Sequence, residues 1–406
     1  MTVGDTPPAN VTILSFEVTV LSAVLQPGNV SLVSAPLKIE IKQLEVETAF
    51  LSTVNVPAGT YSSIALRLQN PEITFKNDTG ATLPSPLNCA NGAICEFKPV
   101  LTAPVTYSGA PFPLTVTANS PIGLLVDVNL ANILNGSLAV DFTANGGVVV
   151  SQLPAQQGTG QLEDMDDVSG KVTAKDTANN QFTLQTPLGS LTIKVDSSTV
   201  FEEFDKLSTP CTAIPQNFTC VQVGQIVEAD LSLVAGGTLL AKKVEAEDDG
   251  QNAEELEGLI TGNITPAGFD MVLVDEFPDI AGVDVGNLVH INFVGFSFRV
   301  DAENLPVGGL SFSSATDLMV GQRVEVKRQG SVSAGTPPAI DANRVTLKKT
   351  TFTAQVKQKL ANGTDFLVDN LPSLFTTASP VPVTEIEVRT SAQTGFDNVT
   401  DVAALN

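Results

Sequence analysis

The feature that most constrains the fold is a repeat in the second half of the chain. Three segments share an apolar anchor, a β-branched residue four positions after it, and a phenylalanine thirteen or fourteen positions after it. They lie at residues 168–182, 256–269 and 352–366. Self-similarity of this kind marks a supersecondary unit that recurs along a chain. The second half of the sequence is therefore predicted to contain three copies of one small unit.

The downstream parts of the first two copies match as well. Val-Gly-Gln-Ile-Val-Glu at residues 223–228 parallels Val-Gly-Gln-Arg-Val-Glu at residues 320–325. Ala-Lys-Lys-Val at residues 241–244 parallels Ala-Asn-Arg-Val at residues 342–345. Together with the upstream segments, these describe a unit of about five strands. Five short strands can hide their edges by closing on themselves, which predicts a small OB-like β-barrel.

The third copy is incomplete. It runs from Phe352 to Asn406 and contains no segment that corresponds to Val-Gly-Gln-x-Val-Glu. An unclosed barrel exposes unpaired backbone, so two explanations stay open: the natural chain continues beyond Asn406, or a strand of another subunit completes the unit. Residues 11–25 form a long strand-forming segment near a free end. Because strand addition builds fibres, we expect a homopolymer assembled through the N-terminal strand and the open C-terminal repeat.

The rest of the chain also has the pattern of strands. Apolar and polar residues alternate at residues 14–20, 37–42 and 191–195, which is the period of a half-buried strand. Turn signals such as Pro27-Gly28 and Asn362-Gly363 separate such runs. No window shows a helical stripe with caps. The predicted fold class is all-β, with an N-terminal β-sandwich followed by three small OB-like β-barrel repeats, the last of them incomplete.

Two acidic runs mark the boundaries of the middle unit. Residues 155–167 and 245–255 are polar and rich in Asp and Glu. A calcium-binding EF-hand loop needs acidic residues at alternating positions, a central glycine and a terminal glutamate, and neither run supplies them. Both runs are therefore predicted to be solvated linkers. The predicted domains are residues 1–160, 161–250, 251–350 and 351–406.

The four cysteines form two pairs of near neighbours. Cys89 and Cys95 lie close together in the sequence, as do Cys211 and Cys220, and prolines and asparagines surround both pairs. A zinc site needs tighter spacing and usually a histidine. We therefore predict two local disulfides, each worth roughly 2–3 kcal/mol by loop closure, although four unrelated buried thiols remain an alternative. Disulfides indicate an oxidising compartment.

Charge and composition exclude several functions. The chain has 21 Lys+Arg against 44 Asp+Glu, a formal net charge of -23, and no Trp. Such a chain repels phosphate backbones and anionic lipid, so no nucleic-acid partner is expected. His290 is the only imidazole, so a multi-histidine metal site is impossible. We expect His290 to be a satisfied strand residue, and we predict no catalytic residue, no metal and no cofactor.

The N-terminus shows no leader, and no apolar stretch is long enough for a membrane helix. Met1 is not followed by a basic region and an apolar stretch, as a signal peptide would require. The chain is then either cytoplasmic or a mature exported form, and the predicted disulfides favour export. No run of about 18 apolar residues occurs, so direct membrane insertion is not expected.

Two bacterial families resemble parts of this sequence. Residues 11–150 resemble domain-of-unknown-function family 4382, through Pro57-Ala-Gly-Thr-Tyr61 closing a hairpin, the strand from Leu37 to Glu47, Pro111-Phe-Pro-Leu114 and Pro121-Ile-Gly-Leu-Leu-Val-Asp127. The repeats resemble a second uncharacterised family, 5666, which often follows the first. The resemblance implies a β-sandwich followed by OB-like barrels in a protein of the bacterial envelope or exterior, and it implies no catalytic residues.

These observations favour a non-enzymatic structural protein of the cell surface. The main expectation is a filament subunit that assembles head to tail by strand pairing between subunits. The alternative is a surface module that binds a glycan or another ligand, although such modules usually present Trp or Tyr faces and this chain has only Tyr61 and Tyr107. A carboxylate-based hydrolase would need two acids placed in one cleft, and nothing in the sequence places them there.

Overall fold

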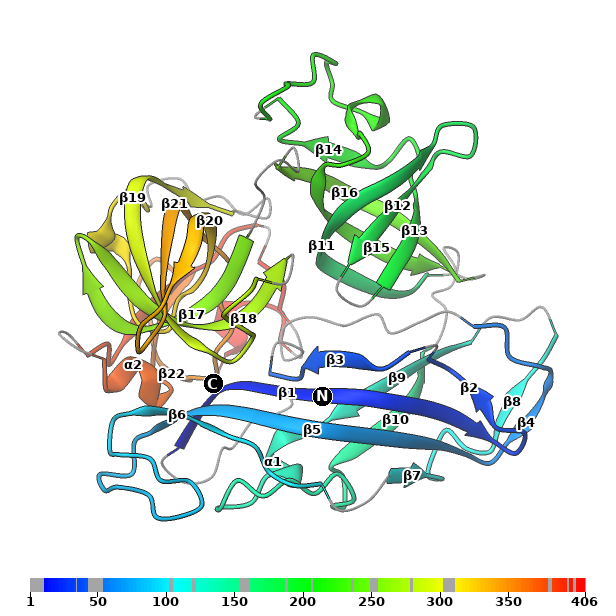
Figure 1. Cartoon of the computed structure of the whole chain (residues 1–406), viewed down its shortest axis with the longest axis horizontal. Helices are drawn as coiled ribbons and strands as arrows, with labels where there is room; N and C mark the ends of the chain where they lie inside the picture. Colours follow the sequence, from blue (N-terminus) through cyan, green and yellow to red (C-terminus); the bar gives the residue numbers. More distant parts are fainter. Residues whose placement is uncertain are drawn as a thin grey trace.

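The computed structural model of the chain describes most of the 406 residues. The described residues are 11–33, 35–42, 54–101, 105–118, 122–153, 161–186, 189–205, 207–234, 237–248, 255–277, 280–301, 311–378, 382–392, 394–396 and 399–405. They are built almost entirely from strands, so the predicted all-β class is confirmed (Figure 1).

A β-sandwich forms the first unit. Its elements are β1 (Val11–Gln26), β2 (Val30–Ser31), β3 (Leu37–Glu40), β4 (Gly59–Tyr61), β5 (Ser63–Asn77), β6 (Ile94–Phe97), β7 (Val105–Tyr107), β8 (Leu114–Val116), β9 (Gly123–Val128), α1 (Leu130–Ile133) and β10 (Val148–Leu153). One sheet has the order β2-β1-β5-β6, with β3 added to β1 and β7 added to β5. The ribbon β9–β10 contributes Val148 and Val150 to the same core as Phe16, whose ring stacks on Phe142 at a centroid distance of 6.3 Å.

Two closed five-stranded barrels follow. The first contains β11 (Gln161–Asp176), β12 (Gln181–Thr186), β13 (Gly189–Lys194), β14 (Val200–Glu202), η2 (Phe218–Cys220), β15 (Ile226–Val234) and β16 (Thr238–Asp248). The second contains β17 (Glu255–Thr265), β18 (Gly268–Phe277), β19 (Leu288–Val300), η3 (Ala315–Asp317), β20 (Arg323–Ser333) and β21 (Ala339–Leu347). We number the strands of each unit in chain order and leave out β14, which is an additional strand beside β16. In both barrels the strands then follow one another around the ring in the order one, two, three, five, four. Strands three and five are parallel. This is the five-stranded Greek-key barrel of OB-like units.

The Val-Gly-Gln motif makes the same turn in both barrels. Gly224 and Gly321 adopt positive φ, 102° and 93°, and donate their backbone N–H groups to Val172 and Ile260 on strand one. Each following glutamine accepts a backbone N–H three residues before it and donates its amide to the preceding 3₁₀ turn. The motif therefore repeats because it fixes how strand four enters the barrel.

The third copy is a half-barrel. It consists of β22 (Gln355–Lys359), β23 (Asp365–Asp369), α2 (Ser373–Thr376), β24 (Ile386–Arg389) and η4 (Val402–Ala404). Its sheet has the order β22-β23-β24, which corresponds to strands one to three of the closed barrels. The turn η4 corresponds to η2 and η3, because Asp401 caps it as Asn217 caps η2. Among the described residues of this unit, no strand occupies the places of strands four and five.

The second barrel is the hub of the molecule. One apolar cluster joins Leu14 of the sandwich, Val272 and Val320 of the second barrel, and Leu374 of the half-barrel. Polar contacts add to it, since Thr74 donates to the carbonyl of Gly286 at 2.7 Å. Figure 1 shows both barrels above the sandwich, with the first barrel (green) beside the second (yellow-green). The core of the first barrel, by contrast, is a cluster of its own.

Two expectations from the sequence need correction. The acidic runs are not linkers throughout: β11 starts at Gln161, β16 extends to Asp248, and β17 starts at Glu255, while residues 155–160 and 249–254 lie outside the described residues. In β16, Glu245 and Glu247 alternate with the core residues Val244 and Ala246, as side chains of a strand do. The proposed hairpin at residues 57–61 also differs, because β4 pairs with the distant strand β8.

Candidate functional site

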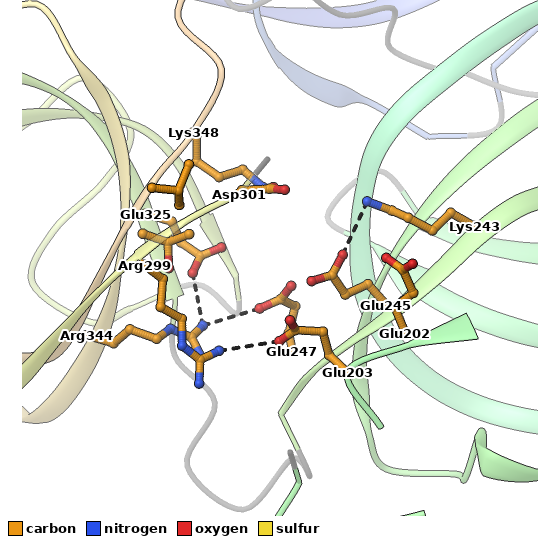
Figure 2. A pocket seen from close by; sticks show the side chains of 12 residues that line it. Glu202, Glu203, Lys243, Glu245, Glu247, Arg299, Asp301, Glu325, Arg344 and Lys348 are labelled. Carbon is orange, nitrogen blue, oxygen red and sulfur yellow. Dashed lines mark hydrogen bonds and ion pairs between the residues drawn. The ribbon is translucent and has the colours of Figure 1, made fainter. Parts of the chain in front are cut away.

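The most concentrated group of charged side chains lies between the two barrels. We call it the ionic joint, and it encloses a pocket of about 300 Å³. Its lining is almost wholly polar, whereas pockets for small organic ligands are lined mainly by apolar side chains. The residues of the pocket, ten of them labelled in Figure 2, are Glu202, Glu203, Lys243, Glu245, Glu247, Arg299, Val300, Asp301, Glu325, Arg344, Thr346 and Lys348.

Strand alternation explains how β16 supplies the first barrel's side of the joint. Val244 and Ala246 point into the barrel core and are buried there. Because successive side chains of a strand point to opposite faces, Lys243, Glu245 and Glu247 point outward. They face the second barrel from the right-hand side of Figure 2.

Arg344 on β21 is the centre of the joint. Its Nη2 lies 3.2 Å from Glu247 of the first barrel, 2.6 Å from Glu255 and 3.0 Å from Glu325. The guanidinium and these three carboxylates are each about nine-tenths buried. One guanidinium thus holds carboxylates that come from both barrels.

Two further ion pairs cross between the barrels. Lys348 lies 3.1 Å from Glu228 on β15 and 2.7 Å from Asp301 of its own barrel. The pair is nearly inaccessible to water, because the side chains of Lys348 and Glu228 are 5% and 4% exposed. Arg299 on β19 reaches Glu203 at 3.4 Å in a more exposed position. Ion pairs therefore link the two barrels at three places.

Burial shifts the proton affinity of the acids in the joint. Desolvation raises the pKa of Glu255 to about 8, and the neighbouring Glu325 adds to that effect. Desolvation, together with the charges of Glu325, Glu255 and Glu228, holds the pKa of Glu247 well above its ordinary value. Burial alone would lower the pKa of Arg344, but the surrounding glutamates outweigh it and raise that pKa. Protonated carboxyls and a permanent cation therefore coexist in the joint near neutral pH.

The cluster contains three carboxylates that approach the spacing of metal ligands. One carboxylate oxygen from each of Glu228, Glu247 and Glu325 lies within 4.8 Å of the others. However, Arg344 contacts two of these groups and Lys348 contacts the third. The side-chain cations supply the positive charge that a metal would bring, so the arrangement suits an ion-paired interface better than a metal centre.

The sequence could have revealed this joint through the repeat. Glu228 and Glu325 occupy the same position of strand four, and Lys243 and Arg344 occupy the same position of strand five. Charged residues in the middle of barrel strands need partners, because burying an unpaired charge is costly. The repeat alone does not show that these charged side chains of the two barrels face each other, because the sequence does not tell how the barrels are placed.

The residues that the sequence singled out are dispersed over the molecule. Disulfides join Cys89 to Cys95 in the sandwich and Cys211 to Cys220 in the first barrel, as predicted. They are structural, since Cys89 and Cys220 are buried in the cores of their own units.

The two remaining residues that the sequence singled out, His290 and Tyr61, also have polar partners. Nδ1 of His290 on β19 lies 2.6 Å from a carboxylate oxygen of Asp270 on the adjacent strand. Tyr61 is buried in the sandwich core and donates its hydroxyl to the carbonyl of Pro57 at 2.8 Å. None of the helices in the described residues is long and apolar enough to cross a membrane.

Comparison with known families finds a similarity for part of the chain. A family model described as Domain of unknown function (DUF5666) matches residues 169–245. The matched segment begins within β11 and ends within β16, so it spans the first barrel. Comparison with curated proteins and with solved structures finds no match. The matched residues include Glu228 of the ionic joint, whose partner Lys348 belongs to the second barrel, and Lys243, which pairs with Glu245 of the first barrel.

Proposed function

We propose that this chain is a non-enzymatic structural protein of the cell exterior that joins another polypeptide by strand pairing at its half-barrel. The observation that carries the proposal is the unfinished core of that unit. Phe182 and Phe269 are 1% and 0% exposed in the closed barrels, whereas the equivalent Phe366 is only half-buried. A strand pair in the places of strands four and five would bury this surface.

The backbone of the third unit supports the same proposal. In the closed barrels strand one already pairs with strand four around its glycine, as Gly170 with Val227 and Gly258 with Val324. In the third unit Ala354 occupies that position, but β22 begins only at the next residue. Residues 352–354 thus form no strand in this structure, and an incoming strand would extend β22 through them.

The identity of the donor differs from the initial expectation. Residues 11–25 lie in β1, which pairs with β5 along its whole length and with β2 and β3 on its other side. Donating this strand would dismantle the sandwich, so it does not enter the proposal. The pattern of strands four and five in the closed barrels describes the occupant instead: a β-hairpin with Val-Gly-Gln-x-Val-Glu on its first strand.

Location outside the cytoplasm is supported by the cysteines. Two local disulfides tie loops to the cores of two different units. Such bonds persist in oxidising compartments and are rare in the cytosol. The ligand-binding alternative receives less support, because Tyr61 is buried and the pocket between the barrels is filled with paired charges.

The experiment adds a synthetic peptide of residues 320–347, the β20–β21 hairpin, to the full chain and follows hydrogen exchange. We expect binding with a stoichiometry of one and new protection of the amides of residues 352–354. Val388 lies on the half-buried face of the edge strand β24, so Val388→Gln should weaken binding. Glu387→Gln introduces the same side chain on the opposite, exposed face and should bind as the unmodified chain does.

Two results would contradict the proposal. One is failure of the peptide to protect residues 352–354 at any concentration. The other is binding that Val388→Gln and Glu387→Gln weaken equally, because such binding would not involve the interior of the half-barrel.

A further inference from the structure

The first barrel is attached to the hub differently from the other two units. The sandwich and the half-barrel share an apolar cluster with the second barrel. The first barrel has a separate, closed core, and among the described residues the ion pairs of the joint link it to the second barrel. Separating the first barrel therefore leaves both barrel cores intact and exposes mainly charged groups, which water solvates well.

We propose that the ionic joint is a pH-sensitive hinge, and that the first barrel swings away from the second when Glu247 and Glu255 lose their protons. The hinge is independent of the half-barrel and of its occupant. It concerns how two units of one chain are held together, and it would operate whether or not the half-barrel is filled.

Counting charges around Arg344 gives the direction of the switch. Protonation of Glu247 and Glu255 removes two of the negative charges around the guanidinium. When both are ionised, three buried carboxylates surround one guanidinium, and Lys348 already has two acids beside it. Like charges in a desolvated interface repel strongly. Opening the joint relieves this repulsion, because it returns the carboxylates to water.

Two lysines near the joint offset only part of the added negative charge. Lys327 lies opposite Glu255 in the β17–β20 ladder, and Lys243 is engaged by Glu245 at 3.2 Å within the first barrel. The charged groups that face Glu247 and Glu255 from the packed elements are Glu202, Glu203, Glu228, Lys243, Glu245, Arg299, Asp301, Glu325, Lys327, Arg344 and Lys348. Acids outnumber bases in this set, so deprotonation moves the joint further from neutrality.

The raised pKa values of Glu247 and Glu255 indicate that the joint opens on the alkaline side of neutrality. Burial raises the pKa of Glu255 to about 8, and the pKa of Glu247 is raised as well. A carboxyl with a raised pKa stabilises the closed state fully below its ordinary pKa, and this contribution is lost as the pH rises through the raised value. The joint is therefore closed in mildly acidic solution and opens as the pH passes about 8.

Small-angle scattering from the full chain tests the hinge. From about pH 5.5 to about pH 9.5 the radius of gyration should rise by about a tenth, because one compact unit moves outward. In the double variant Glu247→Gln, Glu255→Gln the rise should disappear. The matched control Glu385→Gln, Glu387→Gln removes two carboxylates from the exposed side of the half-barrel, and it should expand as the unmodified chain does.

A second variant keeps the test decisive if the double variant misfolds. Arg344→Gln removes the central cation and should open the joint at every pH, while circular dichroism reports that the barrels remain folded. The proposal is overturned if the radius of gyration of the unmodified chain stays constant over this range. It is also overturned if the joint variants expand with the midpoint and amplitude of the control.

Discussion

At the scale of single residues, Gly258 shows how one missing side chain sets the packing of a barrel. A Cβ atom there would lie 2.7 Å from the carbonyl oxygen of Val272 on the neighbouring strand. Gly170 in the first barrel is equally crowded, with the oxygen of Gln185 at 2.6 Å. The repeated glycine therefore reflects a close approach of strands one and two, and the barrels need it for closure.

We expect Gly258→Ala to destabilise the second barrel by about 1–3 kcal/mol, because the added methyl group forces two strands apart. Gly262→Ala is the matched control, since it lies on the same strand and a Cβ there meets nothing within 4 Å. Urea unfolding of the two variants measures the difference. Equal stability of both would show that the close approach relaxes without cost.

The Cys211–Cys220 disulfide is the second feature at this scale. It closes a loop of sequence separation 9 that carries Phe218, whose ring lies 6.3 Å from that of Phe182 in the barrel. Replacing both cysteines by alanine should lower the stability of the first barrel by about 2–3 kcal/mol, because the unfolded loop gains freedom.

Hydrogen exchange of β12 amides measures this loss. The variant lacking Cys89 and Cys95 serves as the control, since its disulfide lies in the sandwich. An equal effect of both variants on β12 would contradict a local role for the bond.

At the scale of elements, the turn before strand four is the feature that both closed barrels share in detail. Gln225 is buried and receives the N–H of Gln222 at 2.6 Å, while its amide donates to the carbonyl of Cys220. Gln225→Ala should cost about 1–3 kcal/mol, because backbone groups lose buried partners. Gln222→Ala, at an exposed position of the same turn, should cost less than about 0.5 kcal/mol.

Thermal unfolding followed by calorimetry distinguishes the two variants. If Gln222→Ala proved as destabilising as Gln225→Ala, the geometry that the two turns share would not depend on the buried glutamine side chain.

The sequence anticipated those elements whose pattern is local. The repeat predicted the two barrels, because its motif fixes a turn and its Phe residues fill the cores. Alternation also predicted β1, but it could not reveal that β5 pairs with this strand along its whole length. The acidic ends of β16 and β17 were misjudged, since Glu247 and Glu255 find Arg344 only after two units have folded and docked. Because Arg344 is so distant in the sequence, neither acidic run by itself indicates that its glutamates have this partner.

At the scale of the whole molecule, buried acids at unit boundaries make stability depend on pH. Glu40 lies beside the contact between the sandwich and the second barrel, and accepts bonds from Ser15 and from the backbone N–H groups of Phe16 and Lys42. Desolvation nevertheless raises its pKa to about 7. The stability it confers is complete below the ordinary glutamate pKa and is lost as the pH rises through about 7.

We therefore expect the free energy of unfolding of the sandwich to fall between about pH 5 and about pH 8. Glu40→Gln keeps the shape of the side chain and an acceptor oxygen but does not titrate, so it should make this dependence less steep, while Glu17, whose pKa burial raises to about 8, still contributes to it. Glu96→Gln, on the exposed strand position of β6, should leave it unchanged. Denaturant unfolding at several pH values measures the slope, and an equal slope in all three proteins would contradict the assignment.

Assembly through the half-barrel is the claim on which the function of the whole molecule depends. Hydrogen exchange of residues 352–354, compared between native cell-surface material and the purified chain, tests it most directly. Strand pairing in the native material predicts slow exchange there and fast exchange in the purified chain. Equally fast exchange in both would contradict the claim, since the half-barrel would then remain open where the protein acts.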